Sequence, residues 1–238
     1  MRTVTRSGID FLVVSDTQNK DFWDRDTWGE TEYALLKKEA HSHSVFVHAG
    51  GWIGPFTLFA GKLFKRVYCL EPDPVAFDEL KTNVELNKLD NVTLERRSFY
   101  GTEGNFLMGS AHSPLGMSGT SMFQTGTDNQ FLTQAVTLSQ FFTGHDIPKN
   151  SFLMLDVEGA EFTLFKDTSF FEKFTPTILV SFHFKMFDHD NLNYLIDSLK
   201  KLQHLYDIDI PLLIKSWETY DKAPDYGAID CLYKPKAS

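Results

Sequence analysis

Short apolar runs alternate along the chain with stretches in which apolar residues recur every three or four positions. Continuous apolar runs of this length suit strands of a parallel sheet, which are covered on both faces, whereas the longer periodicity indicates helices with one buried face. The expected strands cover residues 9–14, 44–47, 67–70, 92–95, 152–155, 178–182, 208–214 and 229–233. The expected helices cover residues 27–40, 53–64, 74–87 and 192–202.

This alternation of strands and helices predicts an α/β fold in which helices cover both faces of a doubly wound sheet. We expect residues 1–43 to form an N-terminal strand and helix that pack on a core domain of residues 44–238, in a single globular unit. Residues 101–133 interrupt the alternation, because they are rich in Gly, Ser and Thr and show little periodicity. They predict an inserted loop, and a loop of that length is more often functional than idle, with disorder as the alternative.

The charge of the chain narrows its range of partners. Acidic residues number 32 and basic residues 23, which gives a formal net charge of −9. A general nucleic-acid binder needs a basic surface to displace the counterions of phosphates, so we expect no nucleic-acid partner. No apolar run approaches the roughly 18 residues of a membrane span, so we expect no integral membrane association. Cys69 and Cys231 lie in apolar, strand-like surroundings, which favours free thiols in a reducing, cytoplasmic location.

A glycine-rich turn that contains Gly50, Gly51 and Gly54 follows the strand at residues 44–47. Glycine suits such a place because the backbone turns sharply and a ligand approaches it without interference from a Cβ atom. The spacing differs from the G-x-G-x-x-G of dinucleotide enzymes, which argues against a nicotinamide oxidoreductase. A helix-entry turn without a ligand would look the same when taken alone.

The next expected strand ends in Glu71. A carboxylate at the carboxyl end of the second parallel strand can accept hydrogen bonds from both ribose hydroxyls of a nucleoside, and it would repel a 2′-phosphate. The alternative is that Glu71 only caps the following helix. The nucleoside interpretation is favoured because the turn and the acid occur together at a suitable distance.

Two further apolar strands end in polar residues, Asp156 and Glu158 after one and His183 after the other. Ligands of open α/β sheets lie at this edge, so we expect Asp156 and Glu158 to face the cleft. Glu161 falls in the first turn of a helix, where the dipole favours a negative charge, and a structural role is preferred for it. His183 has the ordinary pKa of a general base, although a purely positional role is equally open.

Asp156, Glu158 and His183 offer oxygen and nitrogen ligands, which would suffice for magnesium or manganese. Their positions along the chain do not form a compact ligand motif. The sequence therefore predicts no metal.

Taken in order, these segments resemble the FkbM family of S-adenosylmethionine-dependent methyltransferases over about residues 45–183. The resemblance rests on Ala49-Gly50-Gly51-Trp52-Ile53-Gly54-Pro55 with Thr57-Leu58, on Leu70-Glu71-Pro72-Asp73-Pro74, on Asn83 and Asn87 around Leu86, on Asp156-Val157-Glu158-Gly159-Ala160-Glu161, and on Ser181-Phe182-His183. Asn83 with Asn87, or the glycine-rich turn, would mean little alone, but these motifs together in this order are specific.

The resemblance implies a class I, Rossmann-like fold with a mostly parallel seven-stranded sheet whose last strand is antiparallel. It implies S-adenosyl-L-methionine as cofactor and O-methyl transfer to a hydroxyl of a sugar, a glycan or a related small metabolite. The residues expected to contact the cofactor are His48, Gly50, Gly51, Trp52, Gly54, Glu71, Ser98, Phe99 and Asp156. The expected catalytic residues are Asp156 and His183 as candidate bases, with Glu158 orienting the acceptor.

His48 departs from the family pattern, because class I methyltransferases usually have an acidic residue at this position. An imidazole would compensate the cationic groups of the cofactor less well than a carboxylate does. We therefore expect weakened and pH-sensitive cofactor binding. The alternative function is a catalytically silent protein that keeps the fold and only binds the cofactor or a glycan.

Overall fold

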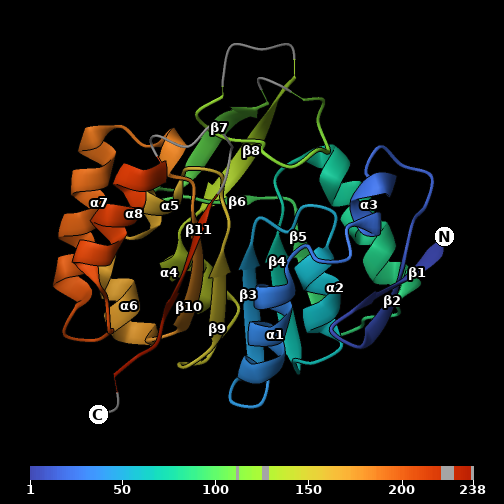
Figure 1. Cartoon of the computed structure of the whole chain (residues 1–238), viewed down its shortest axis with the longest axis horizontal. Helices are drawn as coiled ribbons and strands as arrows, with labels where there is room; N and C mark the ends of the chain where they lie inside the picture. Colours follow the sequence, from blue (N-terminus) through green and yellow to red (C-terminus); the bar gives the residue numbers. More distant parts are fainter. Residues whose placement is uncertain (111–112, 125–128, 221–227, 237–238) are drawn as a thin grey trace.

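The computed structural model describes residues 1–110, 113–124, 129–220 and 228–236. A central sheet lies between two layers of helices (Figure 1). Its strands are β3 (Val45–Ala49), β4 (Arg66–Leu70), β5 (Val92–Glu95), β9 (Phe152–Leu155), β10 (Thr177–Phe182) and β11 (Ile229–Tyr233). They stand in the order β11-β10-β9-β3-β4-β5, and all neighbours are parallel except β10 and β11.

The chain enters the sheet at β3, builds outward through β4 and β5, and then returns to the other side of β3 to form β9 and β10. The predicted doubly wound, mostly parallel α/β sheet with an antiparallel last strand is thereby confirmed. Such a reversal of strand order opens a crevice at the carboxyl ends of the two central strands, which here are β3 and β9.

Alternating side chains of the central strands supply two apolar cores, one on each face of the sheet. Helices α1 (Glu30–Glu39), α2 (Pro55–Gly61) and α3 (Pro74–Leu86) cover the face of Phe46. Helices α4 (Leu138–Gly144), α5 (Glu161–Leu164), α6 (Thr168–Phe174), α7 (His189–Leu202) and α8 (Ile210–Tyr220) cover the face of Val45 and Val47. No described helix is long and apolar enough to cross a lipid bilayer.

The strand predicted at residues 208–214 is wrong, because α8 begins there. Ile210, Leu213 and Ile214 recur at helical spacing and pack on the α7 side of the core. The Asp209 side chain accepts a hydrogen bond from the Leu212 amide at 2.9 Å, which caps the helix start. As a result, the described part of the central sheet has six strands, one fewer than the seven expected.

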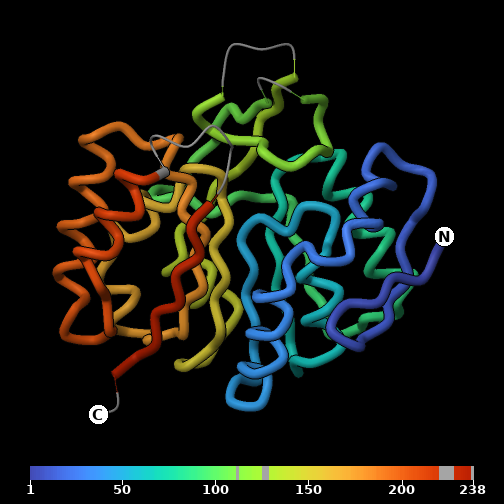
Figure 2. The backbone as a smooth tube through the Cα atoms, in the orientation of Figure 1, coloured from blue at the N-terminus to red at the C-terminus, as the bar shows by residue number. Residues whose placement is uncertain are grey.

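Residues 101–133 also differ from the expected loop, because they contain β7 (Gly104–Gly109) and most of β8 (Gln130–Val136). With β6 (Ser98–Phe99) these strands form a small sheet in the order β6-β8-β7. This sheet extends beyond the end of the central one (Figures 1 and 2), and Gly116 and Thr120 of the loop between β7 and β8 contact Asp73 at the start of α3. Part of that loop, residues 111–112 and 125–128, lies outside the described residues.

The N-terminal segment forms a hairpin rather than a single strand. Its elements are β1 (Arg2–Arg6), β2 (Ile9–Val13) and the 3₁₀ helix η1 (Lys20–Asp24). Asn83 of α3 and Asn87, the residue after α3, accept hydrogen bonds from the amides of Val14 and Leu12 at 2.9 and 2.8 Å. Asn87 also donates to the Leu12 carbonyl at 2.7 Å. Asn83 also donates to the Ile53 carbonyl at 2.9 Å, so these two asparagines join the hairpin, α3 and the glycine-rich turn.

Candidate functional site

A cavity of about 360 Å³ lies at the carboxyl ends of the central strands. This volume is within the usual range for small-molecule sites. The predicted site residues that line it are His48, Gly50, Gly51, Trp52, Glu71, Ser98, Phe99, Asp156, Glu158 and His183. Gly54 is placed differently: a Cβ atom built on it would lie 2.7 Å from Leu80 Cδ1, so it packs against α3.

The first two glycines of the turn are required by close packing. Gly50 has a φ of +86°, and a Cβ atom on it would lie 1.8 Å from the backbone oxygen of Asp156. A Cβ atom on Gly51 would lie 2.2 Å from Cys69 Sγ. Both amides donate to the Leu70 carbonyl, at 2.9 and 3.1 Å. The backbone of the turn thus forms part of the cleft wall, and the Gly50 and Gly51 amides are bonded to the chain itself instead of being open to a ligand.

Glu71 is buried at the end of β4. Its Oε2 accepts a hydrogen bond from the Trp52 amide at 2.6 Å, and its Oε1 accepts one from the Asp73 amide at 2.8 Å. Burial raises the pKa of Glu71 to about 8, although these two hydrogen bonds act in the opposite direction. A carboxylate oxygen has more than one acceptor direction, so both oxygens can accept further hydrogen bonds from a ligand in the cavity.

The alternative reading of Glu71 as a helix cap is wrong, because Asp73 caps α3. Asp73 Oδ1 accepts hydrogen bonds from the Val75 and Ala76 amides at 2.8 and 3.2 Å. Its Oδ2 accepts from the Gly116 amide at 2.8 Å and from the Thr120 hydroxyl at 3.0 Å. Asp73 therefore also fixes the loop of residues 113–121 over the cavity. Sequence reasoning missed this role, although Asp73 stands in the same motif as Glu71.

His48 is buried on the cavity wall. Its Nδ1 lies 2.9 Å from the Thr57 hydroxyl, which in turn donates to Cys69 Sγ at 3.2 Å. Nδ1 is therefore assigned as the donor to Thr57, which leaves Nε2 as a bare acceptor, and this buried atom has no hydrogen-bond partner in the described part of the chain.

Burial lowers the pKa of His48 to about 3. The imidazole is consequently neutral at pH 6 to 7. The expectation that this residue makes cofactor binding pH-sensitive in that range is not supported.

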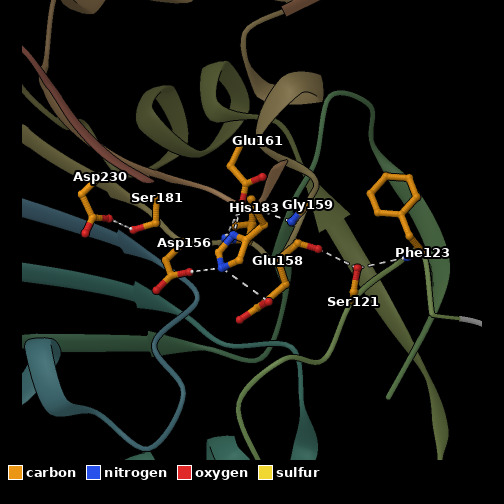
Figure 3. A network of polar contacts seen from close by, with 10 residues as sticks. Ser121, Phe123, Asp156, Glu158, Gly159, Glu161, Ser181, His183 and Asp230 are labelled. Carbon is orange, nitrogen blue, oxygen red and sulfur yellow. Dashed lines mark hydrogen bonds and ion pairs between the residues drawn. The ribbon is translucent and has the colours of Figure 1, made fainter. Parts of the chain in front are cut away.

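Figure 3 shows His183 at the centre of a cluster of carboxylates. His183 Nδ1 lies 2.8 Å from Glu161 Oε1, and Nε2 lies 3.5 Å from both Asp156 Oδ1 and Glu158 Oε2. Glu161 is fully buried, and its Oε1 also accepts a hydrogen bond from the Gly159 amide at 3.2 Å. The strand ends thus bring the three predicted catalytic residues together, and Glu161 orients the histidine from behind.

The carboxylates set the protonation of this cluster. Burial lowers the pKa of His183, but the charge and hydrogen bond of Glu161 and the charges of Glu158 and Asp156 outweigh this effect and raise the pKa to about 10. Burial raises the pKa of Asp156 to about 7 against the opposing charge of His183, and burial also raises the pKa of Glu158. His183 is therefore a cation in the ligand-free cluster rather than a base, and Asp156 is the better candidate base.

The turn after β9 adopts a backbone conformation that side chains rarely take. Glu158 has a φ of +49°, and the following Gly159 has a φ of +96°. A Cβ atom on Gly159 would lie 2.4 Å from Met186 Cβ. The Glu158 carbonyl accepts a hydrogen bond from the Ser121 hydroxyl at 2.6 Å, which is visible in Figure 3 and ties the loop to this turn. Strain of this kind is typical of functional sites.

Aromatic side chains form the wall of the cavity nearest the N-terminal segment. The Phe22 ring lies 4.4 Å from Trp52 and 4.7 Å from Trp28, between ring centroids. Trp28 stacks on Phe56 at 4.9 Å. All four line the cavity. Rings of this type offer flat apolar faces to a ligand.

Two carboxyl groups that the sequence did not indicate also line the cavity, Glu32 of α1 and Asp230 of β11. Burial and a hydrogen bond with Asp230 raise the pKa of Glu32 to about 7. Ser181 donates to Asp230 Oδ1 at 2.5 Å. Neither acid follows an apolar strand, so no local pattern marked it as part of a site.

Residues 45–207 match the methyltransferase FkbM domain family. The chain belongs to this family. The match extends beyond the motifs of the predicted resemblance and confirms it. No curated protein is similar enough to be counted as a match.

Solved structures that match this chain include an rRNA methylase from Streptococcus thermophilus, which is 8% identical. The match covers 87% of this chain and 96% of that chain, with a TM-score of 0.49. A putative methyltransferase from Streptococcus mutans in complex with SAH has 11% identity, coverage of 87% and 97%, and a TM-score of 0.48. The M. jannaschii tRNA m1G37 methyltransferase has 24% identity but covers only 41% of this chain and 30% of its own, with a TM-score of 0.30.

The family makes this chain a methyltransferase with S-adenosyl-L-methionine as its cofactor. The residues around the cavity fit that group. Glu71 places a buried carboxyl group at the cavity wall, and two buried polar atoms, His48 Nε2 and Ser98 Oγ, have no hydrogen-bond partner within the described residues. Both residues line the cavity, and buried polar atoms without a partner are uncommon in folded proteins.

Proposed function

We propose that this methyltransferase transfers the methyl group of S-adenosyl-L-methionine to a hydroxyl of a sugar, a glycan or a related small metabolite. One observation carries the proposal. A single cavity joins the wall of Glu71 and the glycine-rich turn to the cluster of Asp156, Glu158 and His183 at the neighbouring strand ends. A donor site and a site with a base therefore face the same space.

Glu71 holds the ribose hydroxyls in this proposal, while Ser98 and Phe99 border the adenine. Gly50, Gly51 and His48 lie toward the methionine end, where His48 Nε2 accepts a hydrogen bond from the cofactor. When bound, S-adenosyl-L-methionine supplies a methyl carbon on a positively charged sulfur, which is already a good leaving group. The task left to the chain is to align the acceptor oxygen and to exclude water.

Asp156 takes the proton of the acceptor hydroxyl in this scheme. Its pKa of about 7 suits a base that works near neutral pH, and a positioned base of this kind typically contributes about 10²–10⁴-fold in rate. Glu158 orients the acceptor. His183, fixed by Glu161, holds both carboxylates in place through its charge.

The lining of the acceptor side supports a polyol. Trp28 and Trp52 offer ring faces, and Ser118 and Thr120 of the loop over the cavity offer hydroxyls. Several carboxyl groups on the same walls would repel phosphates, so we propose a small-molecule or glycan acceptor rather than a nucleic acid.

Calorimetry and thermal shift with S-adenosyl-L-methionine, S-adenosylhomocysteine and NAD test the donor side. Ligands that bind only the folded chain stabilise it by about 2.7 kcal/mol at a concentration of 100 Kd. We expect a response to the first two and none to NAD. Transfer of a labelled methyl group across a panel of glycans, polyols and RNA then tests the acceptor side, with the methylated atom located by mass spectrometry. A response to NAD alone, or methyl transfer only to a nucleobase, would contradict the proposal.

A further inference from the structure

The strand-end cluster places two oxygen ligands and one nitrogen ligand around a common point. Asp156, Glu158 and His183 each offer one ligand atom, and these atoms all lie within 4.8 Å of one another. His183 Nε2 is 3.5 Å from a carboxylate oxygen of each of the other two. Ligands held at about 2.1 Å by an octahedral cation lie about 3–4 Å apart, so small carboxylate rotations bring these atoms to coordinating positions.

Glu161 supports His183 in the way that a metal ligand is usually supported. Its carboxylate holds Nδ1, which fixes the ring and directs Nε2 toward Asp156 and Glu158 (Figure 3). Metal-binding histidines almost always bind a carboxylate, a carbonyl or water through their other ring nitrogen. Glu161 is itself fixed by the amides of Val157 and Gly159, at 3.3 and 3.2 Å.

Acidic side chains outnumber the one basic side chain in the cluster. Three carboxylates surround one imidazole, and Glu161 is 0% exposed. Its Oε2 is buried and has no hydrogen-bond partner among the described residues. A divalent cation held by Asp156, Glu158 and His183 would offset this concentration of acidic groups.

The cluster also lies where two cavities meet. Glu158 and His183 line the main cavity and a second one of about 250 Å³, to which Ser110, Ser113 and Ser118 contribute hydroxyls. A cation at this point would face the donor cavity on one side and a hydroxyl-lined space on the other.

We propose that Asp156, Glu158 and His183 bind one divalent cation, Mn²⁺ or Mg²⁺, where the two cavities meet. Carboxylate ligands suit both ions, and the imidazole favours Mn²⁺. The role of the ion rests on the proposed function, because it coordinates the acceptor hydroxyl and lowers its pKa. The hydroxyl proton then passes to the free oxygen of Asp156, the oxygen–carbon bond forms, and the carbon–sulfur bond breaks with its electron pair left on sulfur.

Binding of Mn²⁺ to the full chain tests the site without any turnover. The chain is treated with EDTA, dialysed and titrated while electron paramagnetic resonance measures free Mn²⁺. We expect saturable binding of one ion per chain. Asp156→Asn and His183→Ala should abolish it, and Glu161→Gln should weaken the affinity about 10–100-fold, as loss of a supporting carboxylate does. His204→Ala is the matched control, because His204 is an exposed histidine whose Nδ1 lies 2.7 Å from the Lys201 carbonyl oxygen.

Absence of saturable binding, or an affinity unchanged in His183→Ala, would overturn the proposal. Thermal denaturation of each variant shows that it is folded, and Asp156→Asn keeps the test intact if Glu161→Gln does not fold. Calorimetry with S-adenosylhomocysteine in EDTA separates the two ideas. If Mn²⁺ binds and the cofactor does not, the ion site stands and the proposed function is contradicted. If the cofactor binds and Mn²⁺ does not, the ion site is contradicted and the proposed function stands.

Discussion

Replacement of Glu71 by glutamine tests how the donor wall works. The carboxylate accepts hydrogen bonds from the amides of Trp52 and Asp73, one at each oxygen, and Glu71 lines the cavity. Glutamine has the same shape but presents an NH₂ group in place of one oxygen. That group cannot accept a hydrogen bond, so one of the two backbone amides and one ribose hydroxyl lose their acceptor.

The size of the effect follows from the lost bond. A hydrogen bond to a charged group contributes about 1.5–3 kcal/mol, which corresponds to about a 10–150-fold change in Kd. We expect Glu71→Gln to weaken S-adenosylhomocysteine binding by that factor. The unpaired amide should also lower the free energy of unfolding by about 1–3 kcal/mol.

The same substitution has a signature in pH. Burial raises the pKa of Glu71 from 4.5 to about 8, so the folded chain holds this proton more tightly than the unfolded chain does. Glu71 therefore contributes stability that is fully present below pH 4.5 and is lost as the pH rises through 8. Ribose hydroxyls favour the carboxylate, so cofactor binding should release the proton. The affinity of the unmodified chain should therefore rise between pH 6 and 8 relative to that of Glu71→Gln.

Calorimetry with S-adenosylhomocysteine at pH 6, 7 and 8 measures both effects. Glu103→Gln is a suitable control, because Glu103 is exposed and its side chain contacts Gln140 at 2.7 Å. A Glu71→Gln variant that binds within twofold of the unmodified chain, with the same dependence on pH, would refute the assignment of Glu71.

Three further substitutions address the acceptor side, the turn and the N-terminal hairpin. Asp156→Asn should lower turnover about 10²–10⁴-fold while the Kd for S-adenosylhomocysteine changes little, as measured by single-turnover kinetics and calorimetry. Gly50→Ala should prevent stable folding or lower the melting temperature sharply, because the new Cβ atom would lie 1.8 Å from the Asp156 carbonyl oxygen. Asn83→Ala should destabilise the chain by about 1–3 kcal/mol and speed hydrogen exchange at the Val14 amide, which loses its acceptor.

Each of these expectations has an opposite outcome. Equal losses of turnover and cofactor affinity in Asp156→Asn would place this residue in donor binding instead of proton transfer. A normal melting curve for Gly50→Ala would mean that β9 can move away from the turn. Unchanged exchange at Val14 would show that the hairpin is held by its apolar contacts alone.

Much of the sheet was predictable because its central strands, such as β3 and β9, are buried on both faces. The predicted strand at residues 152–155 coincides with β9, and those at 92–95 and 229–233 coincide with the partly buried β5 and β11. Where an apolar run is bounded by polar residues, those residues mark where the strand begins and ends. The glycine turn, Glu71 and the Asp156 segment were likewise visible, because functional residues of this fold follow directly after strands.

Other features depend on contacts between distant parts of the chain. The apolar residues 208–214 are too few to tell a strand from a buried helix by their pattern alone. The segment is a helix because Ile210 and Leu213 pack together against the α7 side of the core. The small sheet was hidden because the Gly- and Ser-rich loop between β7 and β8 dominates the composition of residues 101–133.

The chemistry of single groups was the least predictable part. His183 looked like a base from its ordinary pKa, yet the buried Glu161 behind it and two carboxylates in front make it a cation. His48 looked able to titrate near neutrality, but complete burial keeps it neutral. Burial and neighbouring charge decide these states, and both arise only when the chain has folded.

Asp73 shares its two oxygens between the start of α3 and the loop of residues 113–121. Glu71, which we propose holds the ribose, and Asp73, which anchors this loop, are thereby two residues apart in the sequence. The loop is bound to Asp73 through Gly116 and Thr120, and to the turn after β9 through Ser121. Between these anchors, Ser118 lines both cavities. We expect substitutions at such positions to alter the choice of acceptor while the methyl donor stays the same.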